Sequence, residues 1–298
     1  MSGKPVLGFI GIGLMGRPMS LHLCEAGYEV HVFNRTPSKL APLLDAGATA
    51  AESPAALTRV ADIVFTCVSD TAAQEHVVFG PDGIRDGAKK GGAGKVLVDH
   101  SSIRPDATRD MAARLREETG MGWVDAPVSG GVAGAEEASL AIMCGGDAGD
   151  VGRVRPVVGN MCARLTHMGP QGAGQVTKLC NQMVVVCTLA VLAETVNMGQ
   201  KAGIDAARLP EALAGGWADS KPLQIFVPRM AAGEFDPPFG HLATMLKDID
   251  TATDLGRSQG TALPMSATAA ELLRLMGSHG FLDKEPTELV RLYQDLMG

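Results

Sequence analysis

The chain has 298 residues, of which 46% are hydrophobic and 20% are charged, the ordinary composition of a folded protein with a substantial core. This composition excludes a disordered, collagen-like or coiled-coil chain, and the length suggests roughly two domains. The net charge of −7 and the aromatic content of 4% argue against a nucleic-acid partner, which would need a basic surface or stacking platforms.

Cysteine and histidine patterns narrow the kinds of site to expect. The six cysteines form no CxxC pair, and we expect reduced thiols in a cytoplasmic protein. The histidines are scattered and form no HExxH motif, so no metal site is predicted. The longest apolar run, 183–193, is shorter than the roughly 20 residues that span a bilayer. Because the N-terminus also lacks a signal segment, no membrane partner is expected.

The first elements carry a glycine motif. Residues 5–10 predict a short buried strand, and Gly11-Ile12-Gly13-Leu14-Met15-Gly16 follows it. A helical pattern comes next, with Pro18 in its first turn and Gly27 at its end, and then a second strand over 29–33. This context favours a dinucleotide-binding loop, in which Gly11 allows the turn, Gly13 admits the pyrophosphate and Gly16 permits close helix–strand packing. The helix N-terminus would face the phosphates. A glycine-rich turn of a non-binding domain is the alternative.

The end of the second strand indicates which dinucleotide binds. Asn34-Arg35-Thr36 stands there, where a carboxylate would favour NAD by bonding the ribose 2′-hydroxyl. Arg35 can instead meet a 2′-phosphate, and Asn34 and Thr36 can add hydrogen bonds. We predict NADP rather than NAD; a solvated surface arginine is the alternative reading of Arg35.

Strands and helices alternate up to about residue 166. Ser53 is predicted to cap a helix that starts at Pro54, and a polar start at Asp70 leads a short predicted helix to about Val78. Further strands are expected over 63–68, 95–99, 123–126, 140–144 and 164–167, with a helix over 105–118. This alternation predicts an α/β, Rossmann-type doubly wound and mainly parallel sheet.

From residue 175 onward the pattern is almost entirely helical. Helices are expected over 175–201, 206–214, 221–231, 243–258, 266–277 and 286–297. We therefore predict an NADP-binding domain over 1–166 and an all-helical substrate and dimerisation domain over 167–298, joined by a long helix. The middle of that helix, 183–193, is apolar on nearly every face and must be covered. It is expected between domains or subunits, and a homodimer or homotetramer is predicted.

Three strand-to-loop segments should line the cofactor crevice at the carboxyl ends of the sheet. They are Cys67-Val68-Ser69, Asp99-His100-Ser101-Ser102 and 125–131. The last ends in Ser129-Gly130-Gly131, whose hydroxyl and bare N–H groups suit a substrate carboxylate. An ordinary turn is the alternative there.

A lysine follows the next glycine-rich segment. Gly172-Ala173-Gly174 runs into the long helix, Lys178 lies one turn inside it, and Asn181 and Gln182 share its face. Partial burial beside the apolar stretch lowers the pKa of a lysine, which makes Lys178 a plausible proton donor or acceptor. The alternative is a lysine that merely extends to solvent from the helix start.

Together these segments resemble the β-hydroxyacid dehydrogenase family. Its members include 3-hydroxyisobutyrate dehydrogenase, 2-hydroxy-3-oxopropionate (tartronate semialdehyde) reductase and succinic semialdehyde reductases, with 6-phosphogluconate dehydrogenase more distant. Four blocks match in order along nearly the whole chain: residues 9–19, residues 125–131, Gly172-Ala173-Gly174 with Lys178, and Phe239 with Leu246-Lys247-Asp248.

The resemblance implies roles on the substrate side. Lys178 corresponds to the catalytic lysine, the acid or base at the substrate oxygen. Ser129, Gly130 and Gly131 match the substrate-carboxylate loop. A polar partner follows the lysine by one turn, and many members have asparagine four residues after it. Here Gln182 holds that position and Asn181 precedes it, so which amide contacts the substrate stays open.

The resemblance also implies cofactor contacts. Lys247 matches a lysine that reaches the cofactor and active site from the helical domain, and Ser102 stands where members have Thr or Ser near the nicotinamide. Lysines of the second domain should thus meet the cofactor held by the first. The predicted cofactor-binding residues are Gly11, Ile12, Gly13, Leu14, Met15, Gly16, Asn34, Arg35, Thr36, Val68, Ser69, Ser102 and Lys247.

The predicted function is a reversible hydride transfer between NADP(H) and a small β-hydroxyacid or semialdehyde acid. The substrate would be a small carboxylate of the 2-hydroxy-3-oxopropionate, succinic semialdehyde or 3-hydroxyisobutyrate type. The stretch 215–220 matches no subfamily clearly, which leaves the substrate open. One alternative is imine reduction on the same scaffold, whose enzymes usually replace the lysine found at Lys178. The other is a non-catalytic NADP-binding module.

Overall fold

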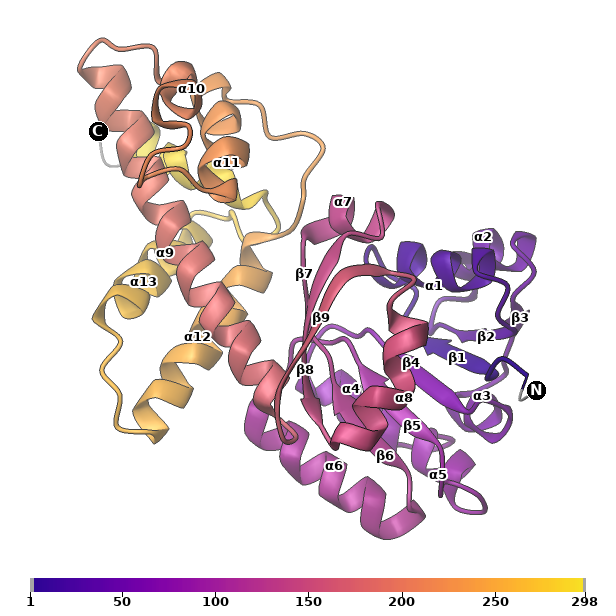
Figure 1. Ribbon diagram of the computed structural model, residues 1–298. Helices are drawn as coiled ribbons and strands as arrows, with labels where there is room; N and C mark the ends of the chain where they lie inside the picture. The colour runs from indigo at the N-terminus through magenta and orange to yellow at the C-terminus, as the bar shows by residue number, and fades with distance from the viewer. Residues whose placement is uncertain (1–2, 297–298) are drawn as a thin grey trace. The chain divides into compact units, whose positions relative to one another are not determined.

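The computed structural model describes residues 3–296 (Figure 1). The chain divides into two compact units, Met1–Lys178 and Leu179–Gly298. The division falls inside the long helix α9 (Ala173–Lys201), and the predicted domain boundary at residue 166 falls inside strand β9 (Cys162–Gly169). Each unit is described by itself.

The first unit is built on a nine-stranded sheet. The strands before β9 are β1 (Leu7–Ile10), β2 (Val30–Phe33), β3 (Thr49–Ala50), β4 (Ile63–Thr66), β5 (Val96–Asp99), β6 (Gly122–Asp125), β7 (Val128–Ser129) and β8 (Leu140–Gly146). Their order is β3-β2-β1-β4-β5-β6-β8-β7, and β9 pairs with β8. The first six are parallel, in the order that binds dinucleotides where β1 meets β4. The predicted Rossmann-type sheet is confirmed, with antiparallel pairing added where β8 meets β6 and β7.

Helices cover both faces of this sheet (Figure 1). They are α1 (Gly16–Glu25), η1 (Pro37–Leu40), α2 (Ala41–Asp45), α3 (Pro54–Val60), α4 (Thr71–Phe79), α5 (Ile84–Ala88), α6 (Pro105–Thr119), α7 (Gly131–Glu136) and α8 (Ala148–Val158). Alternate strand residues point to opposite faces, so Phe9 and Phe65 join one apolar core while Ile10 and Val64 join the other. Burial on both faces explains why these strands are continuous apolar runs.

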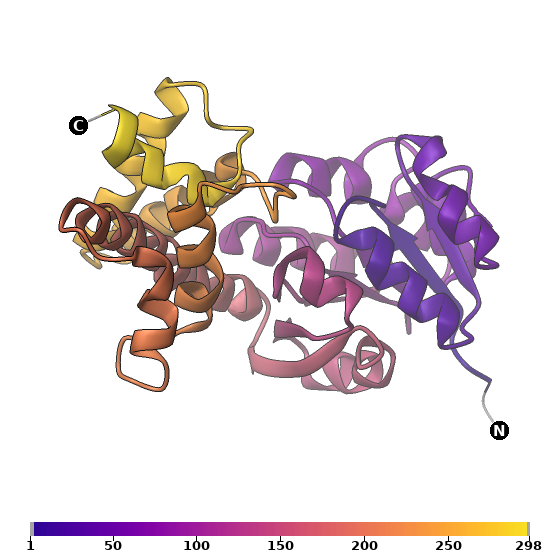
Figure 2. The same cartoon turned by 90° about the horizontal axis from the view of Figure 1, so that it is seen from above.

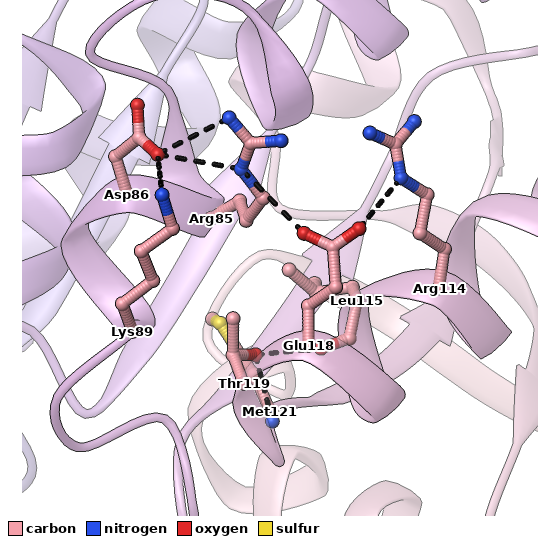
Figure 3. A network of polar contacts seen from close by, with 8 residues as sticks. All are labelled: Arg85, Asp86, Lys89, Arg114, Leu115, Glu118, Thr119 and Met121. Carbon is pink, nitrogen blue, oxygen red and sulfur yellow. Dashed lines mark hydrogen bonds and ion pairs between the residues drawn. The ribbon is translucent and has the colours of Figure 1, made fainter.

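Polar groups fix the helix ends of this unit. Ser53 Oγ accepts the N–H of Ala56 at 3.1 Å, which confirms the predicted cap. Asp70 Oδ1 accepts the N–H of Ala73 at 2.9 Å, so the predicted polar start of the next helix is also a cap. Figure 3 shows a network on α5 and α6, in which Glu118 contacts Arg114 at 2.8 Å and Arg85 at 3.7 Å. These contacts link α6 to α5 at the surface.

The second unit is all helical in its described residues. Besides the later part of α9 it contains η2 (Ala206–Arg208), α10 (Leu209–Leu213), α11 (Lys221–Ala232), α12 (Leu242–Ser258), α13 (Pro264–Ser278), η3 (Pro286–Leu289) and η4 (Leu292–Leu296). Figure 2 shows its orange and yellow helices gathered as one bundle. Val186, Leu189 and Val196 of α9 lie in the single apolar core of this unit.

Helix α9 is long and apolar enough to cross a membrane by length and composition alone, and 44% of its most apolar window is buried inside the protein. A core helix of a soluble protein passes the same test, so the expectation of no membrane partner stays a prediction.

Two predicted helices take a different form. The stretch 206–214 divides into η2 and α10, because Pro210 has no N–H to donate to the carbonyl of Ala206. The stretch 286–297 forms the short turns η3 and η4 instead of one helix; Glu285 holds the N–H of Thr287 at 2.9 Å and tightens the start. Position 297 lies outside the described residues.

Candidate active site

The glycine motif lies at the switch point of the sheet, between β1 and α1. A Cβ added at Gly11, where φ is +99°, would lie 2.3 Å from the carbonyl oxygen of Cys67, and one at Gly16 would lie 2.1 Å from the carbonyl oxygen of Gly11. At Gly13, by contrast, an added Cβ meets nothing within 4 Å. Gly11 and Gly16 are thus required by packing, while Gly13 faces open space. Such a bare cradle at a helix N-terminus fits a dinucleotide pyrophosphate.

The end of β2 supports this loop. Asn34 Oδ1 accepts the N–H of Ile12 at 2.9 Å, and its Nδ2 donates to the carbonyl of Thr36 at 2.9 Å. The amide of Asn34 therefore joins the glycine loop to β2, and its predicted bond to a cofactor stays a prediction. Arg35 and Thr36 are exposed beside it. Leu14 of the loop is exposed, and Met15 is half-buried against the core of α1.

The loops after β4 and β5 are connected by a buried network. The N–H of Val68 donates to Ser101 Oγ at 2.9 Å, and Asp99 Oδ1 accepts the N–H of Ser101 at 2.9 Å and the hydroxyl of Thr66 at 3.1 Å. Burial raises the pKa of Asp99 to about 7, and the hydrogen bonds from Ser101 act in the opposite direction. Val68, Ser69 and Ser102 follow these strand ends, and their predicted contacts with a cofactor stay a prediction.

His100 is buried next to this network. Its ring stacks on Phe65 with centroids 5.7 Å apart, and Nδ1 lies 2.7 Å from the carbonyl of Ala126, so Nδ1 carries the proton and donates. Burial lowers the pKa of His100 to about 4. His100 is therefore neutral at neutral pH. It holds the strand ends through its hydrogen bond to Ala126 and does not act as a general acid.

The predicted carboxylate loop lies between β7 and α7. Gly130 and Gly131 are exposed. Their φ values of 137° and 65° lie in a region of backbone conformation that favours glycine, and the chain leaves β7 there. The ring of His22 on α1 lies 3.0 Å from the carbonyl of Ala135 on α7. That contact places the helix after Ser129-Gly130-Gly131 against the helix after the glycine motif.

Lys178 is half-buried on α9 and is the last residue of the first unit. The start of its helix is held by Asp125 at the end of β6, whose carboxylate accepts the N–H of Gly172 at 2.8 Å and of Gln175 at 3.0 Å. Burial raises the pKa of Asp125, while these N–H groups act in the opposite direction. The glycine-rich segment before Lys178 thus attaches the start of α9 to the end of β6.

Three predicted site residues, Asn181, Gln182 and Lys247, all contact one another or Asp248 in the second unit. Gln182 Nε2 donates to Asp248 Oδ2 at 2.8 Å, Asn181 Nδ2 donates to Gln182 Oε1 at 2.9 Å, and Lys247 Nζ lies 3.3 Å from Asp248 Oδ1. Gln182 is buried and has a protein partner at both ends of its amide, whereas Asn181 is only half-buried. Phe239 of the same motif stacks on Phe226 with centroids 5.3 Å apart.

The sequence places Asp99 and Asp125 in segments expected to line the cofactor crevice and Asp248 in a block that matches the family, but it indicates no individual role for any of the three. Asp99 and Asp125 each end an apolar strand, and that signal could have identified them as buried carboxylates. Within residues 3–296, no group of three or more His, Cys, Asp or Glu side chains is arranged to hold a metal ion.

Comparisons with known proteins agree with this architecture. Residues 6–169 match the family model for the NAD binding domain of 6-phosphogluconate dehydrogenase, and residues 172–293 match the model described as NAD-binding of NADP-dependent 3-hydroxyisobutyrate dehydrogenase. The chain is 37% identical to the 2-hydroxy-3-oxopropionate reductase of Escherichia coli over 285 residues, 96% of either chain.

Two solved structures share the fold over nearly the whole chain. The 3-hydroxyisobutyrate dehydrogenase of Mycobacterium tuberculosis, solved with L-serine, has a TM-score of 0.85 at 28% identity and covers 97% of this chain and 99% of its own. Psf3 in complex with NADP+ and 2-OPP has a TM-score of 0.85 at 26% identity, with coverages of 96% and 99%.

Proposed function

The chain belongs to the β-hydroxyacid dehydrogenase family and is an NAD(P)-dependent dehydrogenase that acts on hydroxyl groups, and from this premise we propose that it reduces a small semialdehyde acid reversibly with NADPH. The observation that carries the proposal is the bare cradle at Gly13, with Lys178 on a helix seated against the same sheet. The 2-hydroxy-3-oxopropionate reductase relative supports a short substrate with a carboxylate.

The residues divide the work of this reaction. When bound, the nicotinamide cofactor supplies or accepts the hydride. In the direction of reduction, Lys178 donates a proton to the developing alkoxide, and the amide of Asn181 or Gln182 holds the same oxygen. The substrate carboxylate binds to the hydroxyl of Ser129 and the exposed N–H groups after it. Lys247, which pairs with Asp248 in the second unit, is proposed as a further positive charge that the reaction uses.

Replacing Lys178 tests the assignment of the proton donor. Lys178→Ala should lower kcat at least about 100-fold, since a positioned general acid contributes roughly 10²–10⁴-fold, and should leave the Kd for NADPH within about twofold. Lys201→Ala, an exposed lysine on the same helix, is the matched control. The substrates to test are the semialdehydes of tartronate, succinate and methylmalonate, together with glyoxylate. Turnover of each is measured as the oxidation of NADPH. Retained turnover in Lys178→Ala would contradict the mechanism.

We propose NADP as the preferred cofactor because Arg35 is exposed at the end of β2, with no carboxylate in Asn34-Arg35-Thr36. A hydrogen bond to a charged group is worth about 1.5–3 kcal/mol, so Arg35→Ala should lower kcat/KM for NADPH about 10- to 100-fold and leave that for NADH nearly unchanged. Arg59→Ala, an exposed arginine on α3, is the control. A wild-type preference for NADH would overturn this reading.

We also propose a homodimer or homotetramer. Val184, Val191 and Met198 follow one another at intervals of seven on α9, and their side chains are 67%, 49% and 67% exposed. Apolar residues at heptad spacing form a seam that a second helix can cover. Sedimentation velocity should give an oligomer for the wild type and a smaller species for Val191→Lys. A monomeric wild-type protein would refute the proposal.

A further inference from the structure

A buried carboxylate holds the start of the helix that carries Lys178. Asp125 is fully buried at the end of β6, and its two oxygens accept the N–H groups of Gly172 and Gln175 at 2.8 and 3.0 Å. N–H groups in the first turn of a helix have no partner inside the helix. Asp125 supplies that partner from a strand 47 residues earlier in the chain, and its charge lies at the positive end of the helix dipole.

Gly174 at the start of α9 and Gly145 on β8 allow the close approach to Asp125. A Cβ at Gly174 would lie 2.8 Å from Asp125 Oδ2 and 2.6 Å from the carbonyl oxygen of Met143 on β8. A Cβ at Gly145 would lie 2.8 Å from Asp125 Oδ1. Any larger residue would push the first turn of α9 away from β6 and β8. Gly174 and Gly145 therefore let the first turn of α9 pack directly against β6 and β8.

Gln175 provides a second attachment, one helical turn before Lys178. Its side chain is buried, Oε1 accepts the N–H of Ile103 at 3.2 Å, and Nε2 donates to the carbonyl of Ser101 at 2.8 Å. These two backbone groups flank Ser102 in the loop after β5. The first turn of α9 is therefore bonded both to β6 and to the loop expected beside the nicotinamide.

We propose that Asp125 and Gln175 are positioning residues that fix Lys178 relative to the loop after β5. The inference rests on the proposed function, in which Lys178 is the proton donor. Its physical basis is that a displacement of about 1 Å can cost roughly 100-fold in rate. Charge-assisted hydrogen bonds are about twice as strong as neutral ones, so the carboxylate holds the turn more firmly than an amide can.

The test is a pair of variants with separate readouts for binding and turnover. Asp125→Asn keeps the size of the side chain but places an NH₂ group against an N–H donor, and Gln175→Ala removes the second attachment. Each should lower kcat about 10- to 100-fold and leave the Kd for NADPH, from fluorescence titration, within twofold. The double variant should lose less than the product of the single losses, because both act on one turn.

Asp147→Asn is the matched control, since Asp147 caps α8 through the N–H groups of Gly149 and Asp150 and that helix carries no predicted site residue. Its kcat should stay within twofold of the wild type. Unchanged kcat in Asp125→Asn or Gln175→Ala overturns the inference, as does a loss that comes entirely from weaker NADPH binding. An active Lys178→Ala variant would contradict the proposed function itself. An inactive Lys178→Ala variant together with a fully active Asp125→Asn variant would contradict only the positioning role of Asp125.

Discussion

Asp99 is the buried carboxyl group whose removal should most clearly change the pH dependence of stability. It is fully buried at the end of β5, and among residues 3–296 its Oδ2 has no hydrogen-bond partner while Oδ1 has two. Burial raises its pKa from 3.8 to about 7, with a further contribution from the charge of Asp125. Cys67, on the neighbouring strand end, faces the same group.

The sign of the effect follows from where the proton is held. Below pH 3.8 both the folded and the unfolded chain carry it. As the pH rises toward 7, the unfolded carboxyl ionises and the folded one does not, so the free energy of unfolding falls by about 1.4 kcal/mol per pH unit. Between pH 5 and pH 8 the loss from Asp99 is about 2–3 kcal/mol. Above pH 7 the folded carboxyl is ionised too and the loss stops growing.

Asp99→Asn removes this dependence and keeps an acceptor oxygen for Ser101 and Thr66. The stability of the variant relative to the wild type should therefore rise by about 2–3 kcal/mol from pH 5 to pH 8. Urea unfolding followed by tryptophan fluorescence reports the first unit, because Trp123 is 1% exposed there while Trp217 is already in solvent. Asp45→Asn, the same change at an exposed site, is the matched control for the loss of one carboxyl group. A pH-independent difference for Asp99→Asn would refute the reasoning.

Further predictions concern the glycine motif and the surface network of the first unit. Gly16→Ala should lower the thermal midpoint and weaken NADPH binding at least about tenfold, because its Cβ would collide with the carbonyl of Gly11. Gly13→Ala should weaken NADPH binding without changing the thermal midpoint, since its Cβ has open space in the protein; a lowered midpoint would contradict that geometry. Glu118→Gln should cost about 0.5–1 kcal/mol in urea unfolding at low salt and less at high salt, because exposed ion pairs are weak and screened.

The N-terminal half of the sheet could be predicted from the sequence because its signals are local. Strands buried on both faces are continuous apolar runs, and Ser53 and Asp70 bond groups only three residues away. The glycine motif combines two steric requirements, at Gly11 and Gly16, with one open position, at Gly13. These constraints act within a single strand–turn–helix and leave a readable pattern.

The contacts that organise the candidate site could not be predicted, because they join distant segments. The bond from Gly172 to Asp125 spans 47 residues, and the one from Gln182 to Asp248 spans 66. The hydrophobic periodicity of a sequence gives no information about contacts between residues so far apart. Helix α8 was not predicted for a different reason: its buried valines have helical spacing, but Gly149, Gly152 and Pro156 are poor helix formers and lower the helix propensity of the segment.

Asp99 and Asp125 lie opposite each other on the neighbouring strands β5 and β6, and the two carboxyl groups differ in their hydrogen-bond partners. Burial raises the pKa of both carboxyls, but at Asp125 the N–H groups at the start of α9 oppose that rise, whereas Asp99 Oδ2 has no hydrogen-bond partner among residues 3–296. Because the charge on Asp125 contributes to the raised pKa of Asp99, Asp125→Asn should lower that pKa. The pH-dependent loss of stability assigned to Asp99 should then end at a lower pH in Asp125→Asn than in the wild type, in the same urea measurement. An unchanged pH profile would show that burial alone sets the proton on Asp99.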